Sequence, residues 1–209
     1  MGTYRAPVED MNFLIDEVLD AENALGTLPD FADYGVGSEL TTALLDEAAK
    51  LAGDELAPLR RVGDEQPAVC TDGAVTAPPG YDAALRQLAE GGWIGISSDP
   101  RYGGQGLPEI YNTVGHEMWN GANMALWLAP MLSSGAALAI HAHGTEAQKQ
   151  TYLEKMNTGQ WMGTMNLTES GAGSDLGVMK AKAVPEGDHY RISGQKIYIT
   201  WGDHQSTEN

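Results

Sequence analysis

A short glycine-rich segment, 165–175, is the part of this sequence best suited to chemistry. It reads MNLTESGAGSD and joins the end of a predicted strand to a turn. Small residues let a backbone approach a ligand closely, the hydroxyls of Thr168 and Ser174 offer donors, and successive N–H groups can form an anion-binding nest. These properties suit a phosphorylated planar cofactor, although a bulged turn at a sheet edge would use the same residues. The segment matches neither a P-loop nor a Rossmann fingerprint, because it precedes a strand instead of opening a helix.

Other reactive side chains have simpler structural interpretations. His141 and His143 stand two apart at the end of an apolar helix, where polar capping is the usual role. Zinc binding is not expected there, because no cysteine or carboxylate stands at ligand spacing. Glu169 could be a base, but an acid beside a turn more often fixes the turn by accepting N–H bonds. Cys70 lies in a proline-bearing loop without an adjacent base. No residue is therefore predicted to be catalytic, and no metal site is predicted.

The elements that must position the glycine-rich segment are helical up to about residue 160. Apolar residues recur at helical spacing over 8–25. A second helix with the same spacing is predicted to be capped by Ser38 and to end at or near Pro58. Residues 61–80 are rich in proline and glycine and are therefore predicted to be a connection.

Two further helices are predicted in the middle of the chain, after a short one at 81–90 that glycines stop. Pro108 is expected as the first residue of a helix that reaches about residue 120 and packs against the apolar helix after it. The apolar run 124–140 is 17 residues long and contains Pro130. A bilayer span needs roughly 20 predominantly apolar residues, so a buried helix at the centre of the core is predicted instead of a membrane span.

The pattern changes from helix to strand near residue 160. Thr145 and Gln148 have capping-box spacing, which predicts a helix that ends near residue 157. Alternation then predicts strands at 161–168, 178–184, 189–193 and 195–201. The predicted fold class is α+β, with an N-terminal all-α helical bundle over 1–160 followed by the first strands of an antiparallel β domain over 161–209. Because such a half-sheet leaves unpaired edges, we expect the chain to be a fragment, truncated relative to a longer protein.

Charge and cysteine content restrict the partners and the compartment. There are 29 acidic and 12 basic residues, and the net charge of -17 excludes a protein that grips nucleic acid through a basic face. The charge does not exclude an anionic cofactor, because backbone N–H groups can bind phosphate. Cys70 is the single cysteine, and residues 1–20 lack the charge pattern of a leader, so we expect a cytoplasmic protein.

Three signatures together resemble those of the acyl-CoA dehydrogenase family. They are YGGQGLP at 102–108, LTESGAGSD at 167–175 and ISGQKIYIT at 192–200, and their order and spacing match the family. The resemblance covers nearly the whole chain, from the helical domain into the middle β domain. The segments YRAP at 4–7 and TWGDH at 200–204 look like the larger subfamily that includes 3-methylmercaptopropionyl-CoA dehydrogenases.

This resemblance implies an FAD-dependent oxidoreductase of fatty acid metabolism. Such a flavoprotein oxidises an acyl-CoA thioester to the trans-2-enoyl-CoA and passes the electrons to an electron-transferring flavoprotein, and the full-length protein is expected to be a homo-oligomer. In the family a Glu carboxylate takes the α proton while the β hydride goes to flavin N5. Ser174 is also implied in binding the substrate thioester. The implied cofactor-binding residues are Met165, Asn166, Leu167, Thr168, Gly173, Ser174, Tyr198, Ile199 and Thr200.

The sequence also departs from the family pattern. Ser170 stands where members often have Pro, Tyr198 where they have Trp, and WGD at 201–203 where they have Asn-Gly-Gly. An aromatic residue at position 198 still suits a flavin face. The family's base lies in a C-terminal helical domain, so the catalytic Glu is expected beyond residue 209 and the fragment is expected to be inactive alone.

Alternatives stay open at the level of sequence. The chain could be a non-catalytic acyl-CoA-binding or interaction module that keeps the fold, or a helical scaffold with an unrelated β appendage. Met118, Met124 and Met131 are interpreted as packing residues, and a role of the same residues in lining an acyl-binding site is compatible with that interpretation.

Overall fold

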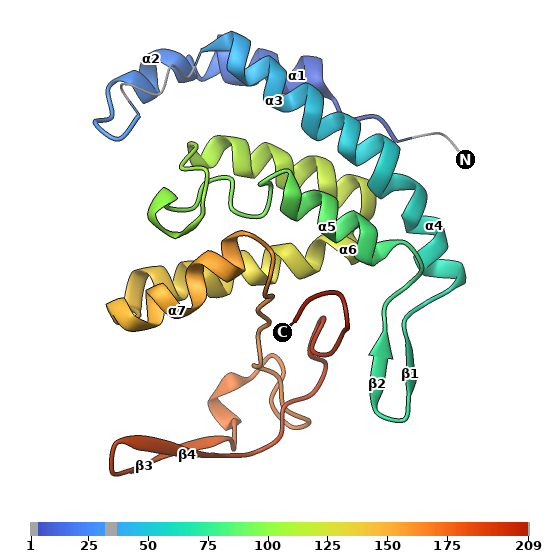
Figure 1. Cartoon of the computed structure of the whole chain (residues 1–209), viewed down its shortest axis with the longest axis vertical. Helices are drawn as coiled ribbons and strands as arrows, with labels where there is room; N and C mark the ends of the chain where they lie inside the picture. Colours follow the sequence, from blue (N-terminus) through green and yellow to red (C-terminus); the bar gives the residue numbers. More distant parts are fainter. Residues whose placement is uncertain (1–3, 32–36, 209) are drawn as a thin grey trace. The chain divides into compact units, whose positions relative to one another are not determined.

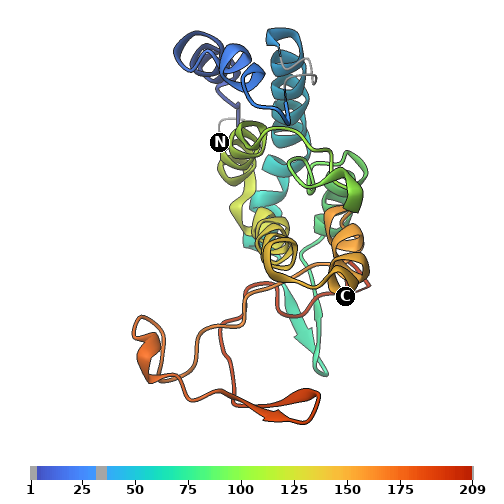
Figure 2. The same cartoon turned by 90° about the vertical axis from the view of Figure 1, so that its left-hand side faces the viewer.

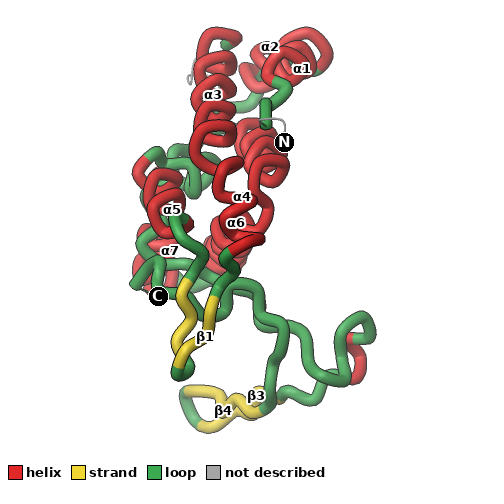
Figure 3. The backbone as a smooth tube through the Cα atoms, turned by 90° about the vertical axis from the view of Figure 1, so that its right-hand side faces the viewer, coloured by secondary structure: helices red, strands yellow, loops and turns green. Residues whose placement is uncertain are grey.

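The computed structural model describes residues 4–31 and 37–208 and divides into two compact units. The larger unit comprises Met1–Gly163 together with Asp203–Asn209, and the smaller unit comprises Thr164–Gly202. The larger unit is mainly helical, and the smaller one consists of loops, a short 3-10 turn and one antiparallel hairpin (Figure 3). The predicted fold class is confirmed, and the domain boundary after residue 160 stays a prediction.

The first predicted helix, 8–25, is interrupted in the structure. Helix α1, Val8–Phe13, continues into a π-helical segment, Leu14–Val18, and α2 occupies Ala21–Gly26. Asp20 separates them with a φ of 46°, in the left-handed region that aspartate tolerates better than most residues. Asn23, in the first turn of α2, stabilises this conformation, because its Nδ2 donates to the Asp20 carboxylate at 2.9 Å. The apolar spacing continues across the break and so does not reveal it.

The second predicted helix is longer than expected. Helix α3, Ser38–Lys50, leads through a π-helical segment, Leu51–Leu56, into α4, Ala57–Glu65 (Figure 1). The prediction that Pro58 ends this helix is wrong, because Pro58 lies in the first turn of α4, where the missing N–H of proline leaves no bond unmade. The predicted cap is also wrong, since the N-cap residue precedes Ser38 and no side chain caps the helix.

The predicted connection, 61–80, contains regular structure. The end of α4 occupies its first residues, and strands β1, Val69–Thr71, and β2, Ala74–Thr76, form an antiparallel hairpin. Asp72 and Gly73 have φ angles of 51° and 84°, the two positive values that a two-residue type I′ turn requires. The turn residues Asp72 and Gly73, which predict a connection, therefore form the turn of a hairpin.

Helix α5, Tyr81–Glu90, has the predicted bounds and is followed by a structured loop. This loop contains a short 3-10 helix, Pro100–Tyr102, and folds back on itself. Glycine is required at Gly104, because a Cβ atom there would collide with the carbonyl oxygen of Ser98. This close approach lets the two arms of the loop pair, because Gly106 N donates to Ser98 O at 2.9 Å.

Helix α6, Glu109–His143, runs through the larger unit (Figure 2). Pro108 is its N-cap and not its first residue. The two packed helices predicted here are confirmed, because α6 consists of two helices joined at a kink at Asn123, whose φ of -157° and ψ of 83° are not helical, and the rings of His116 and Trp127 pack across it. The buried Asn123 side chain starts the second helix, because Oδ1 accepts from Leu126 N, and it ties the kink to Leu56 O through Nδ2, each at 3.2 Å.

The core of the larger unit is built around this kink. Trp119 and Trp127, on either side of it, are the largest fully buried side chains, and their ring centroids are 4.3 Å apart. Trp93 adds a T-shaped contact to Trp119 at 5.4 Å. Helix α6 therefore supplies the centre of the core, as predicted. Its length and its mean hydropathy of 1.4 over an 18-residue window would also allow it to cross a membrane, but core helices commonly meet the same criterion.

Helix α7, Glu146–Asn157, packs along the second half of α6. The predicted capping box is confirmed: Gln148 N donates to Thr145 Oγ1 at 3.3 Å, and Thr145 N donates to Gln148 Oε1 at 2.8 Å. Leu153 and Met156 on α7 belong to a buried cluster that also includes Ala137 of α6. The capping box thus sets the start of a helix whose apolar face covers α6.

The smaller unit contains the hairpin that the turn signal at 186–188 predicts. Strand β3, Lys182–Glu186, pairs antiparallel with β4, His189–Ser193, and both strands are exposed along their whole length. The strand predicted at 178–184 starts later than expected, because a 3-10 turn occupies Leu176–Val178.

The strands predicted at 161–168 and 195–201 are wrong. In the structure a single backbone hydrogen bond, from Ile197 N to Thr168 O, joins these two segments, and neither forms a ladder. Tyr198 and Trp201 have φ angles of 57° and 52°, which lie outside the β region. The alternation of apolar and polar residues is present, but the backbone turns at these two positions.

Candidate functional site

The two segments predicted to contact a cofactor lie side by side in the smaller unit. Ile197 N donates to Thr168 O at 2.9 Å, which joins 165–168 to the start of 197–200. Thr164 Oγ1 donates to Thr200 O at 2.6 Å, although 36 positions separate the two residues in the sequence. The structure therefore brings together the predicted site residues of both segments.

A buried carboxylate holds this pair of segments together. Lys180 N and Ala181 N donate to the Glu169 carboxylate at 2.7 and 2.9 Å. Lys196 Nζ donates to the same carboxylate at 2.9 Å and to Leu167 O at 2.8 Å. Because Lys196 directly precedes 197–200 and Glu169 directly follows 165–168, this ion pair links the two segments at their ends.

The contacts of Glu169 also define its protonation. The N–H group of Lys180, the Lys196 ammonium and the N–H group of Ala181 stabilise the charged form, which lowers the pKa of Glu169 to about 2. A carboxylate that is saturated with donors and so weakly basic is poorly suited to removing a proton from a substrate. The prediction that Glu169 fixes the turn by accepting N–H bonds is confirmed.

The predicted cofactor-binding residues differ in exposure. Tyr198 is 87% exposed and Met165 is 61% exposed, so both offer uncovered apolar surface. Gly173 and Ser174 lie in the turn that follows Glu169, and no backbone hydrogen bond joins them to 197–200 in the described residues. Asn166 and Thr200 are exposed, whereas Leu167, Thr168 and Ile199 are half-buried.

These groups fit a planar cofactor with polar edges. Among the described residues, no hydrogen bond occupies the hydroxyls of Thr168 and Thr200, so both are available as donors. A Cβ atom at Gly173 would meet nothing within 4 Å, which shows that internal packing does not require glycine there. The open space at Gly173 and the exposed ring of Tyr198 leave room for a planar ring and a phosphate chain.

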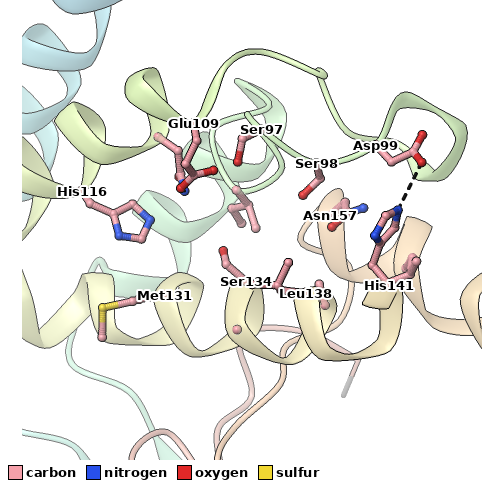
Figure 4. Close-up of a pocket in the computed structure, with 15 residues that line it drawn as sticks. Ser97, Ser98, Asp99, Glu109, His116, Met131, Ser134, Leu138, His141 and Asn157 are labelled. Atoms are coloured by element: carbon pink, nitrogen blue, oxygen red, sulfur yellow. Dashed lines mark hydrogen bonds and ion pairs between the residues drawn. The ribbon is translucent and has the colours of Figure 1, made fainter. Parts of the chain in front are cut away.

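A second concave site lies wholly within the larger unit and is named the α6 pocket (Figure 4). It has a volume of about 430 Å³ and lies between the loop at 94–99 and the two halves of α6, with α7 at one side. The sequence motifs did not predict this pocket. The available signal was a polar stripe at positions 109, 112 and 116, which share one helix face. The lining residues are Ile94, Ser97, Ser98, Asp99, Glu109, Asn112, His116, Met131, Ser134, Gly135, Ala137, Leu138, His141, Leu153 and Asn157.

At one end of the α6 pocket, Asp99 is fully paired. Arg101 Nη2 lies 2.6 Å and His141 Nε2 3.2 Å from the Asp99 carboxylate (Figure 4). The hydrogen bond from Arg101 is the largest cause that holds the pKa of Asp99 far below its usual range. His141, which was expected to cap the helix, pairs with this carboxylate instead, and His143 is exposed. Within 4–31 and 37–208, no group of three or more potential ligand side chains could hold a metal ion.

The other end of the α6 pocket has unsatisfied polar atoms. Glu109 Oε1 accepts a hydrogen bond from Asn112 Nδ2 at 2.7 Å. His116 Nε2 is buried and has no hydrogen-bond partner among the described residues, and its ring packs T-shaped on Trp127 at 5.1 Å. Burial lowers the pKa of His116, so the imidazole is neutral at pH 7.

The three methionines of this region have different environments. Met118 is completely buried and packs in the core, whereas Met124 is 60% exposed. Met131 lines the α6 pocket. The packing interpretation therefore holds for Met118, and Met131 is the one of the three that a ligand in the pocket would meet.

Comparison with known proteins places the larger unit in a family. Residues 38–160 match the family model described as acyl-CoA dehydrogenase, N-terminal domain, which is more than half of the chain. The chain belongs to the acyl-CoA dehydrogenase family. The matched range includes every residue that lines the α6 pocket.

Curated relatives of this acyl-CoA dehydrogenase chain extend the match to nearly its whole length. It is 40% identical over 208 residues to the 3-methylmercaptopropionyl-CoA dehydrogenase of Ruegeria pomeroyi, an alignment that covers 99% of this chain and 35% of that protein. It is 32% identical to a butyryl-CoA dehydrogenase of Syntrophomonas wolfei, with 99% and 34% covered. The chain thus spans about a third of the length of these relatives.

Solved structures have the same fold over most of the chain. A glutaryl-coenzyme A dehydrogenase in complex with glutaryl-CoA matches with a TM-score of 0.66 and 25% identity, covering 80% of this chain and 40% of that one. An acyl-CoA dehydrogenase from Geobacillus kaustophilus matches with a TM-score of 0.64 and 26% identity, covering 79% and 40%. The helical arrangement is therefore that of the family.

Proposed function

We propose that this chain is the N-terminal part of an FAD-dependent acyl-CoA dehydrogenase that oxidises an acyl-CoA thioester to the trans-2-enoyl-CoA. Membership of the family supports the class of enzyme, an oxidoreductase of fatty acid metabolism. The observation that carries the FAD assignment is the hydrogen bond from Ile197 N to Thr168 O. It supports a flavin site because it holds the two signature segments beside each other, with their donors free.

The chemistry of this proposal depends on donors and exposed surface. Bound FAD would supply the acceptor for the hydride that leaves the acyl β carbon. The hydroxyls of Thr168 and Thr200 would donate to the polar edge of the ring and stabilise negative charge there. Tyr198 and Met165 would cover the ring and exclude water, since both side chains are largely exposed in the structure.

The remaining roles concern the phosphate chain and the proton. Gly173 and Ser174 would approach the FAD chain, and Ser174 would also bind the thioester. Glu169 holds the segments and does not remove the α proton, because Lys196 and two N–H groups already occupy its carboxylate. We assign that proton transfer to a Glu on polypeptide outside these 209 residues.

The proposed partners follow from the same reaction. An electron-transferring flavoprotein would take the electrons, and the full-length enzyme would be a homo-oligomer in the cytoplasm. Reduction of purified electron-transferring flavoprotein by the full-length enzyme, light scattering of that enzyme and cell fractionation would test these three points separately. A membrane-bound monomer that reduces no flavoprotein would contradict all of them.

Flavin binding is the direct test of the proposed function. FAD added to the purified chain should lose fluorescence as it binds, and Thr168→Val or Thr200→Val should weaken the affinity by about threefold to tenfold, the effect of one lost hydrogen bond. Thr151→Val is the matched control, because the Thr151 hydroxyl bonds only to the backbone of its own exposed helix turn. A wild-type chain that leaves FAD unquenched, or a control variant as weak as the two site variants, would contradict the proposal.

A second candidate function is a non-catalytic acyl-CoA-binding module that retains the fold. The observation in its favour is that every residue lining the α6 pocket belongs to the larger unit, so a ligand could bind there without a flavin. Calorimetry decides between the two: acyl-CoA binding by a chain that does not bind FAD would favour the module over the dehydrogenase.

A further inference from the structure

The α6 pocket combines an apolar wall with polar atoms that lack partners. Met131, Leu138 and Leu153 supply aliphatic surface suited to a short carbon chain. The buried Nε2 of His116, another lining residue, has no hydrogen-bond partner among the described residues. A purely aliphatic ligand would leave this nitrogen unpaired, and a buried polar atom without a partner is costly. The pocket therefore suits a ligand that carries a polar atom as well as a chain.

The charge of the α6 pocket restricts what that polar atom can be. Its lining includes two carboxylates and no Lys or Arg. The carboxylate of Asp99 is compensated by Arg101 and His141, whereas Glu109 makes no ion pair among the described residues. An anionic group near Glu109 would be repelled, and no cation of the lining would offset its desolvation. An un-ionised donor, such as a hydroxyl, has no such penalty.

The geometry places these selective groups at one end of the pocket. In Figure 4, Glu109 and His116 lie at the end away from the Asp99–His141 pair, and Met131 lies below His116. A neutral imidazole offers either a donor or an acceptor at Nε2, and a hydroxyl can serve both. The Glu109 carboxylate, whose charge acts on His116, has one oxygen unoccupied by Asn112 and can accept a hydrogen bond from an un-ionised donor.

We propose that the α6 pocket binds the acyl group of the substrate and selects acyl groups that end in an un-ionised hydrogen-bonding group, such as a hydroxyl, over those that end in a carboxylate. His116 is the recognition residue, and Glu109 is the residue that excludes anions. This proposal rests on the proposed function, because it takes the ligand to be an acyl-CoA. The selectivity goes beyond the family assignment, because membership of the family does not specify which chemical group ends the acyl chain.

Three CoA thioesters with the same number of acyl carbons test this selectivity: hexanoyl-CoA, 6-hydroxyhexanoyl-CoA and adipyl-CoA, which end in a methyl, a hydroxyl and a carboxylate. In calorimetry with the full chain, the hydroxyl ester should bind about tenfold more tightly than the hexanoyl ester, and adipyl-CoA should bind about tenfold more weakly than the hexanoyl ester. Equal affinities for the three esters, or tightest binding of adipyl-CoA, would overturn the proposal. Absence of binding by all three would overturn it as well.

Two variants assign the selectivity to residues. His116→Phe keeps an aromatic ring against Trp127 and should abolish the preference for the hydroxyl ester over the hexanoyl ester. Glu109→Gln should reduce the discrimination against adipyl-CoA about tenfold, because it removes the uncompensated charge. His143→Phe and Glu117→Gln are matched controls on the same helix, since both residues are exposed and neither lines the pocket. Controls that change the selectivity as much as the pocket variants would refute the assignment.

A spectroscopic measurement on the wild-type chain tests the role of His116 without relying on the correct folding of a substituted protein. The imidazole NMR signal of His116 should shift on addition of 6-hydroxyhexanoyl-CoA and shift less with hexanoyl-CoA. Binding without any change in this signal would show that the ester occupies another site and would overturn the proposal. None of these measurements needs FAD. Selective ester binding without flavin binding would therefore refute only the proposed function, and flavin binding with equal ester affinities would refute only the pocket proposal.

Discussion

The larger and smaller units are stabilised by different interactions. Trp119, Leu88 and Leu126 are completely buried in the larger unit. In the smaller unit, which the structure describes in full, only Glu169 and Ala172 are buried. Burial of apolar surface thus accounts for the larger unit, whereas the smaller unit depends on hydrogen bonds that converge on one carboxylate. Polar contacts, and not a hydrophobic core, therefore align the segments predicted to bind the cofactor.

The largest expected effect tests the hydrophobic side of this comparison. Trp119→Ala should lower the free energy of unfolding of the larger unit by about 3–5 kcal/mol, because it removes a buried aromatic ring and leaves a cavity. Urea denaturation followed by circular dichroism measures this change. Met124→Ala, on the same helix but at a 60% exposed position, should change it by no more than about 0.5 kcal/mol. Similar losses in both variants would show that the Trp119 contacts do not dominate the core.

A smaller and more local effect tests the polar side. Glu169→Gln keeps the shape of the side chain and removes the charge that pairs with Lys196. Hydrogen exchange at the Lys180 and Ala181 amides should accelerate about tenfold, while the urea transition of the larger unit stays unchanged. Glu186→Gln is the control, because its pair with Arg191 is exposed and should leave these amides unaffected. A variant with wild-type exchange would mean that Glu169 does not hold the segments.

The smallest expected effect is a difference in acid sensitivity between the units. The pKa of Glu169 falls from 4.5 to about 2 on folding, so its contribution is complete above pH 4.5 and is lost as the pH falls toward 2. Burial lowers the pKa of His116, so protonation favours the unfolded larger unit, and stability decreases as the pH falls below 6.5. Between pH 6.5 and 4.5 the larger unit should therefore weaken first. Amide exchange measured in both units across this range should show it, and His116→Phe should reduce the difference, while His204, whose pKa burial also lowers, maintains the remainder. Simultaneous loss of protection in both units would contradict it.

Local signals predicted some elements well. The capping box at Thr145 and Gln148, the helix Tyr81–Glu90 and the hairpin turn at 186–188 depend on a few neighbouring residues, and each is present as predicted. Predictions that relied on a single proline or on alternation alone failed. Pro58 fits inside the first turn of a helix, and the backbone turns at Tyr198 within a segment whose alternation is that of a strand. The periodicity of apolar residues shows which side chains can share a face. It does not show whether a neighbouring strand is present to form the backbone hydrogen bonds of a sheet.

Short runs of the chain encode the family signatures, the order of most helices and the residues of the predicted cofactor segments, so these features could be predicted from the sequence. The fold was needed to show that Glu169 and Lys196 join those segments, and that the loop at 94–99 meets both halves of α6 to form a pocket. Both contacts join residues distant in sequence, and the pocket also depends on the kink at Asn123, so no local pattern specifies them.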